Sequence, residues 1–279
     1  MRRTSRRDAS RFQVFWFRSR AQPLCFSVGI LAAALGLSAC SGDLFSGGQQ
    51  AQEEFFFEED ATGRTEFRLE GINGNIDVIA ESGTEELVVG GFKRVRSSSL
   101  ADAREQLDRL QVNVTVEGDA IVIRTQQPSD TEGRTFEVEY NLIVPERLEG
   151  DIRNVNGNIL IDSMDDDVEV ITTNGNITLQ DHVGSADVTS TNGNLDATVT
   201  ISLGGEIDMN TVNGSIDLDI PASTSATFSA RLANGSITTS GLSLDDAQST
   251  PVSLTGVLGD GDGEIDIETV NGNITVRGF

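Results

Sequence analysis

The residues that could do chemistry in this 279-residue chain are carboxylates, one histidine and two cysteines. The candidate metal ligands are Asp260, Asp262 and Glu264, which alternate with glycines near the C-terminus. Calcium takes about six to eight oxygen ligands, and this run lacks the ligand spacing of an EF-hand loop. We therefore predict a turn at residues 259–264 and no dedicated metal site, with a calcium-dependent binding protein as an alternative.

Nucleophilic catalysis would have to be built around His182, because the chain has no other histidine. The sequence has no G-x-S-x-G elbow, and one histidine with one cysteine, which we predict below to be lipidated, cannot form a zinc site without carboxylates. We expect His182 to lie in a surface loop. We predict no catalytic residue and no cofactor.

Paired carboxylates such as Asp217 and Asp219 offer a second kind of chemistry, since glycoside hydrolysis uses two carboxyl groups. Sugar-cleaving sites usually add aromatic platforms, and this chain has a single Tyr and a single Trp. We interpret the protein as non-enzymatic. An exported polysaccharide-acting enzyme on a β-helical scaffold remains the alternative.

A repeat must position these side chains. Seven Asn-Gly-Asn or Asn-Gly-Ser corners each separate two segments of alternating apolar residues, which predicts stacked structural units. The corner asparagines are Asn73, Asn156, Asn174, Asn192, Asn213, Asn234 and Asn271. Asn-Gly also favours hairpins, so the pattern leaves a hairpin meander open. We favour an all-β chain forming a single β-solenoid, similar to a parallel β-helix, because stacked corners let asparagine amides hydrogen-bond along a column.

The solenoid domain is predicted over residues 55–279, in two parts. Residues 55–149 contain strands and one short helix at 99–111, whose apolar face comprises Leu100, Ala103, Leu107 and Leu110. Residues 150–279 contain the tandem repeats.

The C-terminal end of the array raises the question of capping. Between Asn234 and Asn271 we expect one coil that has lost its corner motif. The sequence stops at Phe279, directly after the last corner, and an open coil presents an unpaired edge. We therefore expect the C-terminal coil either to make a homotypic or partner contact or to be protected by Phe279 folding back.

Residues 1–39 have the pattern of a signal peptide. Seven arginines precede an apolar run that is too short to span a membrane and ends in small residues. The following Leu-Ser-Ala-Cys at 37–40 resembles the bacterial lipobox, which predicts lipidation of Cys40. Cys25 lies in the segment that would be removed, so no disulfide is expected.

Residues 40–54 are rich in Gly, Ser and Gln, which predicts a flexible tether, and Phe55 and Phe57 share one face of the first expected strand. The formal net charge is −24, and removal of the arginine-rich segment makes the chain more acidic. Such a charge repels phosphate backbones, so we expect no nucleic-acid partner.

The order NGNIDV, a Leu-Val-Val strand, a short helix and YNLIVPERLEGDIRNVNGNILI, followed by serial Asn-Gly corners, resembles the bacterial "putative adhesin" domain family of toastrack type. The resemblance covers residues 55–279, and its most specific part is Val144-Pro145 with the following NGNI. It implies a β-solenoid in the cell envelope, with roles in adhesion or envelope-stress sensing, and it supplies no catalytic residues.

Together these features predict a lipid-anchored, non-enzymatic scaffold, adhesin or envelope-stress interaction module. Its expected partners are a membrane, through Cys40, and a protein or glycan. The expected location is the cell envelope, and Ser41 after the cysteine is compatible with outer-membrane sorting.

Overall fold

The computed structural model describes residues 48–279 as two facing β-sheets with one helix. The predicted signal peptide, Cys40 and most of the predicted tether lie outside the described residues. The helix is α2 (Leu100–Leu107).

Sheet A contains, in spatial order, β1 (Gln49–Asp60), β4 (Glu86–Ser97), β7 (Thr135–Pro145), β3 (Ile76–Glu81), β9 (Ile159–Asp162), β11 (Ile177–Val183), β13 (Leu195–Thr200), β15 (Ile216–Ile220), β21 (Ile274–Gly278) and β17 (Ile237–Ser240). Sheet B contains β18 (Leu244–Thr250), β19 (Ser253–Leu258), β16 (Ala226–Asn234), β20 (Gly263–Asn271), β14 (Glu206–Asn213), β12 (Ala186–Asn192), β10 (Val168–Asn174), β8 (Glu149–Asn156), β2 (Glu66–Glu70), β6 (Ala120–Gln126) and β5 (Gln111–Glu117).

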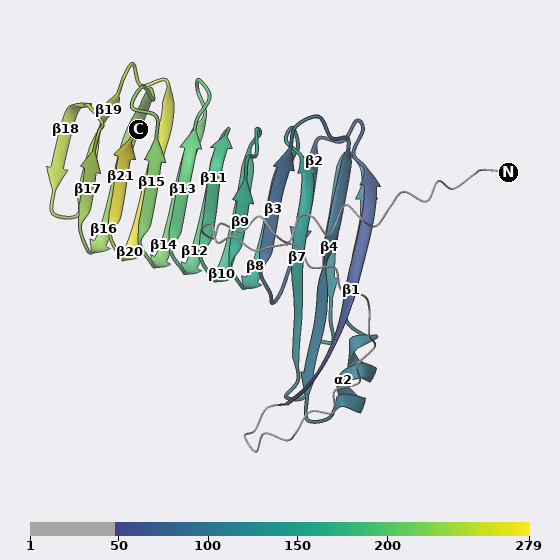
Figure 1. Cartoon of the computed structure of the whole chain (residues 1–279). Helices are drawn as coiled ribbons and strands as arrows, with labels where there is room; N and C mark the ends of the chain where they lie inside the picture. The colour runs from purple at the N-terminus through teal and green to yellow at the C-terminus, as the bar shows by residue number, and fades with distance from the viewer. Residues whose placement is uncertain (1–47) are drawn as a thin grey trace, which may run out of the picture. The chain divides into compact units, whose positions relative to one another are not determined.

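Each Asn-Gly corner carries the chain from sheet B to sheet A, so one coil contributes one strand to each sheet (Figure 1). Corresponding strands of neighbouring coils pair in parallel and in register, for example Val170 with Val188 and Ile177 with Leu195. A meander would pair consecutive strands antiparallel, so the predicted solenoid is confirmed and the meander is excluded.

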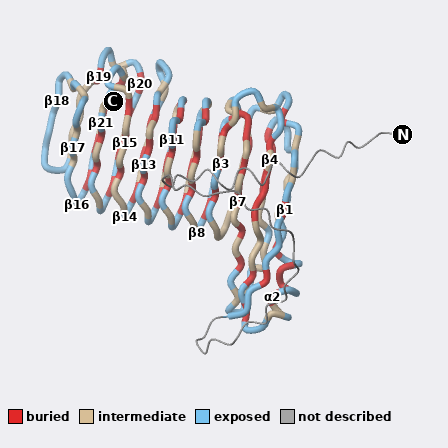
Figure 2. The backbone as a smooth tube through the Cα atoms, viewed as in Figure 1, coloured by how far each residue is buried: buried red, intermediate tan, exposed pale blue. Residues whose placement is uncertain are grey.

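The core is the row of apolar side chains between the two sheets. Figure 2 shows the buried residues in red, recurring along the strands of every coil. Burial alternates along most coil strands, as in β10, where Val168 and Val170 are buried and Glu169 is half-buried on the outer face. The period of two therefore sets which side chains face the core and which face solvent.

The corner asparagines form one hydrogen-bonded column. From Asn156 onward, each Nδ2 donates to the Oδ1 of the corner asparagine in the spatially preceding coil, at 2.7 to 3.0 Å, and the Nδ2 of Asn73 donates to the Phe136 carbonyl oxygen. In spatial order the column contains Asn73, Asn156, Asn174, Asn192, Asn213, Asn271 and Asn234. The predicted stacking of asparagine over asparagine is confirmed.

The glycine of each corner is required because the backbone of a neighbouring strand or coil approaches it closely. A Cβ at Gly193 would lie 1.9 Å from the carbonyl oxygen of Gly175, and the same clash recurs at Gly214 against Gly193. No side chain fits at that distance, which explains why the repeat keeps Asn-Gly as a pair.

The C-terminal coil does not end the stack. Its strands β20 and β21 lie between β14/β15 on one side and β16/β17 on the other, with parallel pairing to both. The expected open C-terminal edge is therefore wrong, because both sides of this coil are paired. Phe279 does not fold back as a cap either: its main chain bonds to Ile220 and Ala222, and the residue is 64% exposed.

The segment between Asn234 and Asn271 also differs from the predicted coil. It forms an antiparallel hairpin of β18 and β19, and β19 pairs with β16 at the end of sheet B. Without an Asn-Gly corner it has no turn that would direct the chain into sheet A, so it covers only half of the terminal coil.

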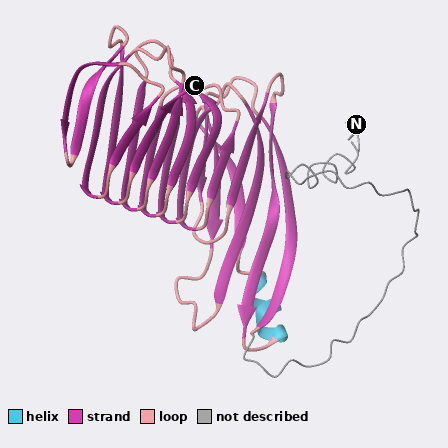
Figure 3. Cartoon of the chain, turned by 60° about the vertical axis from the view of Figure 1, so that its left-hand side comes forward, coloured by secondary structure: helices cyan, strands magenta, loops and turns pink. Residues whose placement is uncertain are grey.

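At the other end, β1, β4 and β7 are long antiparallel strands that extend beyond the coils, with α2 beside them (Figure 3). Ser99 caps the helix by accepting a hydrogen bond from the amide of Asp102. The predicted helix is confirmed in a shorter form, and Ala103, Leu107 and Leu110 are buried as expected.

The first strand begins earlier than predicted. Gln49–Glu54 belong to β1 and pair with β4, so the expected tether is too long at its C-terminal side. Phe55 and Phe57 do share one face, where the Phe55 ring lies edge-on to Tyr140 at 5.6 Å.

Candidate functional site

The most regular polar feature of the described residues is a row of acids on the outer face of sheet B, here called the carboxylate column. It contains Asp151, Glu169, Asp187, Asp208 and Asp266. These residues are direct neighbours in the parallel register of β8, β10, β12, β14 and β20. Neighbouring strands of a sheet lie about 4.8 Å apart, so the column sets like charges at that repeat.

A second row of acids runs beside the column and includes Glu66, Glu149, Asp167 and Glu206. Between the two rows lies an open depression of about 410 Å³, lined by both and by Arg68. Its lining contains no aromatic side chain. Apart from Arg68, which pairs with Glu66, the charged side chains of the lining are acids, and the depression lacks a platform on which a sugar could stack.

Cations neutralise the ends of the column but not its middle. Arg153 lies 2.9 Å from Asp151 and 2.6 Å from Glu169, and Arg231 lies 3.1 Å from Asp266. Within residues 48–279 no Lys or Arg forms an ion pair with Asp187 or Asp208. The middle of the column is thus the part where negative charge stays uncompensated.

The pKa values follow this arrangement. Burial, together with the charges of Asp187, Asp266 and Glu206, raises the pKa of Asp208. Burial and neighbouring acids likewise raise the pKa of Glu149. Both shifts arise because partial burial and like charges disfavour the ionised carboxylate.

Sheet A carries a smaller acidic group formed by Asp196, Asp217 and Asp219. Arg277 of the C-terminal coil lies 3.0 Å from Asp217 and 3.2 Å from Asp219. Burial, then the charges of Asp217 and Asp219, raise the pKa of Asp196. Asp217 and Asp219, considered above as a carboxyl pair for glycoside hydrolysis, are therefore both engaged by one arginine.

The calcium candidates do not form a ligand set. The amides of Asp260 and Asp262 donate to the hydroxyl of Ser225, and that hydroxyl donates to Asp262 at 2.8 Å. Glu264 is the second residue of β20 and lies opposite Glu206. In the described part of the chain, no group of three or more acidic, His or Cys side chains is arranged to hold a metal ion.

His182 is not the surface residue we expected. It lies on β11, is 1% exposed, and its Nε2 is 3.0 Å from the carbonyl oxygen of Ser185. Burial lowers its pKa, since a charged imidazole loses hydration there. The loop prediction missed that β11 continues past a register shift after Leu179, which turns His182 inward.

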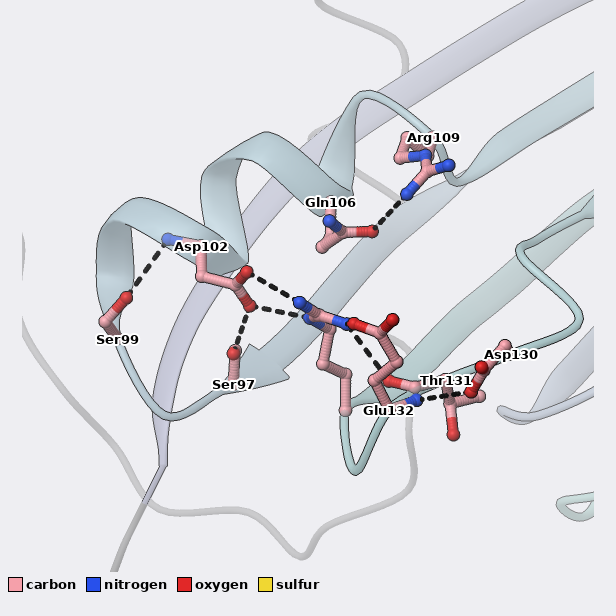
Figure 4. Close-up of polar contacts among 9 residues, drawn as sticks. Ser97, Ser99, Asp102, Gln106, Arg109, Asp130, Thr131 and Glu132 are labelled. Carbon is pink, nitrogen blue, oxygen red and sulfur yellow. Dashed lines mark hydrogen bonds and ion pairs between the residues drawn. The ribbon is translucent and has the colours of Figure 1, made fainter.

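A separate polar cluster holds α2 against the base of β4 (Figure 4). Both carboxylate oxygens of Asp102 accept from Arg134, at 2.7 and 2.9 Å, and Ser97 donates to the same carboxylate. These hydrogen bonds, from Arg134 first, lower the pKa of Asp102 to about 2. We call this cluster the helix tie. Its role is structural, because all of its partners belong to the N-terminal end of the domain.

The carboxylate column was not predicted, although the sequence contains a signal for it. Each acid of the column stands five positions before a corner asparagine, from Asp151 before Asn156 to Asp266 before Asn271. An alignment of the repeats by their corners would have revealed it. Cys40 lies outside the described residues, and within residues 48–279 no helix is long and apolar enough to cross a membrane.

Stacked coils with Asn-Gly corners and an acidic outer face define an all-β repeat protein of the toastrack type. Residues 66–277 match the family model Toastrack DUF4097, and the chain belongs to this family. No curated protein is similar enough to match the sequence.

Three solved structures illustrate the likeness. A "putative cell adhesion protein" from Clostridium sporogenes is 14% identical, with 82% of this chain and 100% of that chain covered and a TM-score of 0.44. A "putative adhesin" from Bacteroides fragilis is 13% identical, with coverages of 81% and 97% and a TM-score of 0.34. A "putative lipid binding protein" from Parabacteroides distasonis is 12% identical, with coverages of 83% and 96% and a TM-score of 0.29. At these TM-scores the likeness carries no conclusion about this chain's activity.

Proposed function

We propose that the mature protein is a lipid-anchored, non-enzymatic interaction module of the cell envelope, acting as a scaffold, an adhesin or a component of envelope-stress sensing. The observation that supports the non-enzymatic part is the depression on sheet B, which is open, lined by many acids and one arginine, Arg68, and free of aromatic side chains. Glycosidases rely on a separated pair of carboxyl groups, one acid and one base or nucleophile, beside a sugar-binding surface. A predominantly acidic, open face fits association better than catalysis.

The anchoring part of the proposal rests on the sequence before the described domain. The Leu-Ser-Ala-Cys pattern at 37–40 follows a basic and an apolar segment, and β1 begins only nine residues after Cys40, at Gln49. A lipid on Cys40 would hold the coils near a membrane surface while the short linker leaves them free to meet partners.

Metabolic labelling with an alkyne-tagged fatty acid tests the anchor in bacteria producing the full chain. Wild type should take up label, Cys40→Ser should lose it, and the matched control Cys25→Ser should keep it, since Cys25 lies in the segment to be removed. Label that persists in Cys40→Ser, or an unlabelled wild type, would refute the anchor.

A second experiment separates association from catalysis. The purified protein is incubated with cell-wall and capsular polysaccharides, and release of reducing ends is compared with that of an Asp187→Asn/Asp208→Asn variant. We expect no release from either protein. Release by the wild type that the double variant lacks would establish the enzyme alternative.

A further inference from the structure

The seven Asn-Gly corners carry a chemistry of their own. In an Asn-Gly pair the glycine nitrogen can attack the asparagine side-chain carbon, forming a five-membered succinimide as ammonia leaves. Water then opens the ring to aspartate or to isoaspartate. The balance is one water consumed and one ammonia released, with no oxidant or reductant, so every corner is chemically able to react.

Six of the seven corners restrain the attacking nitrogen. The N–H of each of these glycines donates to the main-chain oxygen of the corner asparagine in the next coil, at 2.8 to 3.0 Å. The restrained glycines are Gly74, Gly157, Gly175, Gly193, Gly214 and Gly272. A nitrogen held in this way must leave its hydrogen bond before it can attack, which requires local opening of the stack.

The corner of Asn234 and Gly235 differs because its coil is the last in space. β17 is the edge strand of sheet A, and the hairpin of β18 and β19 continues only sheet B. Among the described residues the Gly235 N–H has no hydrogen-bond partner, and the Asn234 Oδ1 accepts no bond from a further asparagine.

Two further observations distinguish this corner. Gly235 is exposed, whereas the other six corner glycines are half-buried. The Asn234 side chain makes one bond in the asparagine column, from its Nδ2 to Asn271 Oδ1 at 3.0 Å. The nucleophile, its target and the water that completes the reaction are thus more accessible here than elsewhere in the column.

We infer that Asn234 is a site of spontaneous deamidation and that it deamidates before the other corner asparagines of the stack. The product is a carboxylate with no N–H to donate to Asn271, so two oxygen acceptors face each other at the end of the column. An isoaspartyl product also adds a methylene group to the main chain, which shifts β17 relative to β21. The terminal coil is then held less tightly, while the inner coils keep their asparagine hydrogen bonds.

Peptide mapping by mass spectrometry tests the inference on the full chain, kept folded for days in mildly alkaline buffer. We expect deamidation at Asn234 at least about tenfold faster than at any other corner, a ratio equivalent to about 1.4 kcal/mol of protection. Faster reaction at another corner, or equal rates at all seven, would overturn the inference.

The same chain in denaturant is the matched control, because all seven sites are then the same unrestrained dipeptide. Their rates should converge; a persisting preference for Asn234 would show that the fold is not its cause. The variant Asn234→Asp tests the consequence by hydrogen exchange. Amides of β17 should exchange faster than in wild type and those of β13 should not, and unchanged β17 amides would refute the loosening.

Discussion

Removing one asparagine from the middle of the column should cost more than removing the one at its end. Asn192 donates to Asn174 and accepts from Asn213, both at 2.9 Å, whereas Asn234 makes only its bond to Asn271. A hydrogen bond contributes about 0.5 to 1.5 kcal/mol net. Asn192→Ala should therefore lower the free energy of unfolding by about 1 to 3 kcal/mol, and Asn234→Ala by about half as much.

Urea unfolding followed by circular dichroism measures both variants against wild type. The slope of free energy against urea must stay unchanged for the midpoints to be compared, because a changed slope would indicate lost cooperativity. An Asn192→Ala midpoint equal to that of wild type, or a larger loss in Asn234→Ala, would refute the idea that the column adds stability bond by bond.

Two other predictions concern the corner glycines and the helix tie. Gly193→Ala places a Cβ 1.9 Å from the Gly175 oxygen, so it should lower the free energy of unfolding by about 3 kcal/mol or more. Gly204→Ala is the control: the space around the new Cβ is open, and the variant should cost only about 1 kcal/mol because the backbone there is left-handed. Equal melting temperatures of the two variants would contradict the clash at Gly193. Asp102 has a folded pKa of about 2, against 3.8 for an ordinary aspartate, so its contribution to stability is present above about pH 4 and is lost as pH falls toward 2. In a circular dichroism titration, the stability of Asp102→Asn should therefore change less over that acid range than the stability of the wild type. An unchanged dependence of stability on pH would show that the hydrogen bonds from Arg134 to Asp102 do not stabilise the fold.

Much of the fold could be predicted from the sequence because a period of two and a repeated corner specify it locally. The inward side chains around Val170 and the stacking of Asn174 on Asn156 both follow from that pattern. The order of the last two coils could not be predicted. The segments containing Asn234 and Asn271 have equivalent corners and similar alternation, so either could have followed Asn213.

The site was less accessible to sequence reasoning. Acids such as Asp187 and Asp208 stand alone within their own coils, and a single coil gives no reason to connect them. Only the parallel register brings them into one column. His182 was misplaced for a similar reason, because the register shift in β11 has no signature in the local residues.

The spatial order of the coils underlies both the carboxylate column and the exposed corner at Asn234, and a pair of engineered disulfides tests it directly. In the chain with Cys25 and Cys40 replaced by Ser, Asn210→Cys with Glu268→Cys joins paired positions of β14 and β20. Asn210→Cys with Arg231→Cys spans two strand spacings, about 10 Å, beyond the roughly 7 Å limit for a disulfide. We expect the first pair to oxidise in the folded protein and the second to stay reduced. Closure of the second pair, with the first remaining reduced, would show that the coils stack in sequence order and would contradict the placement of β20 between β14 and β16.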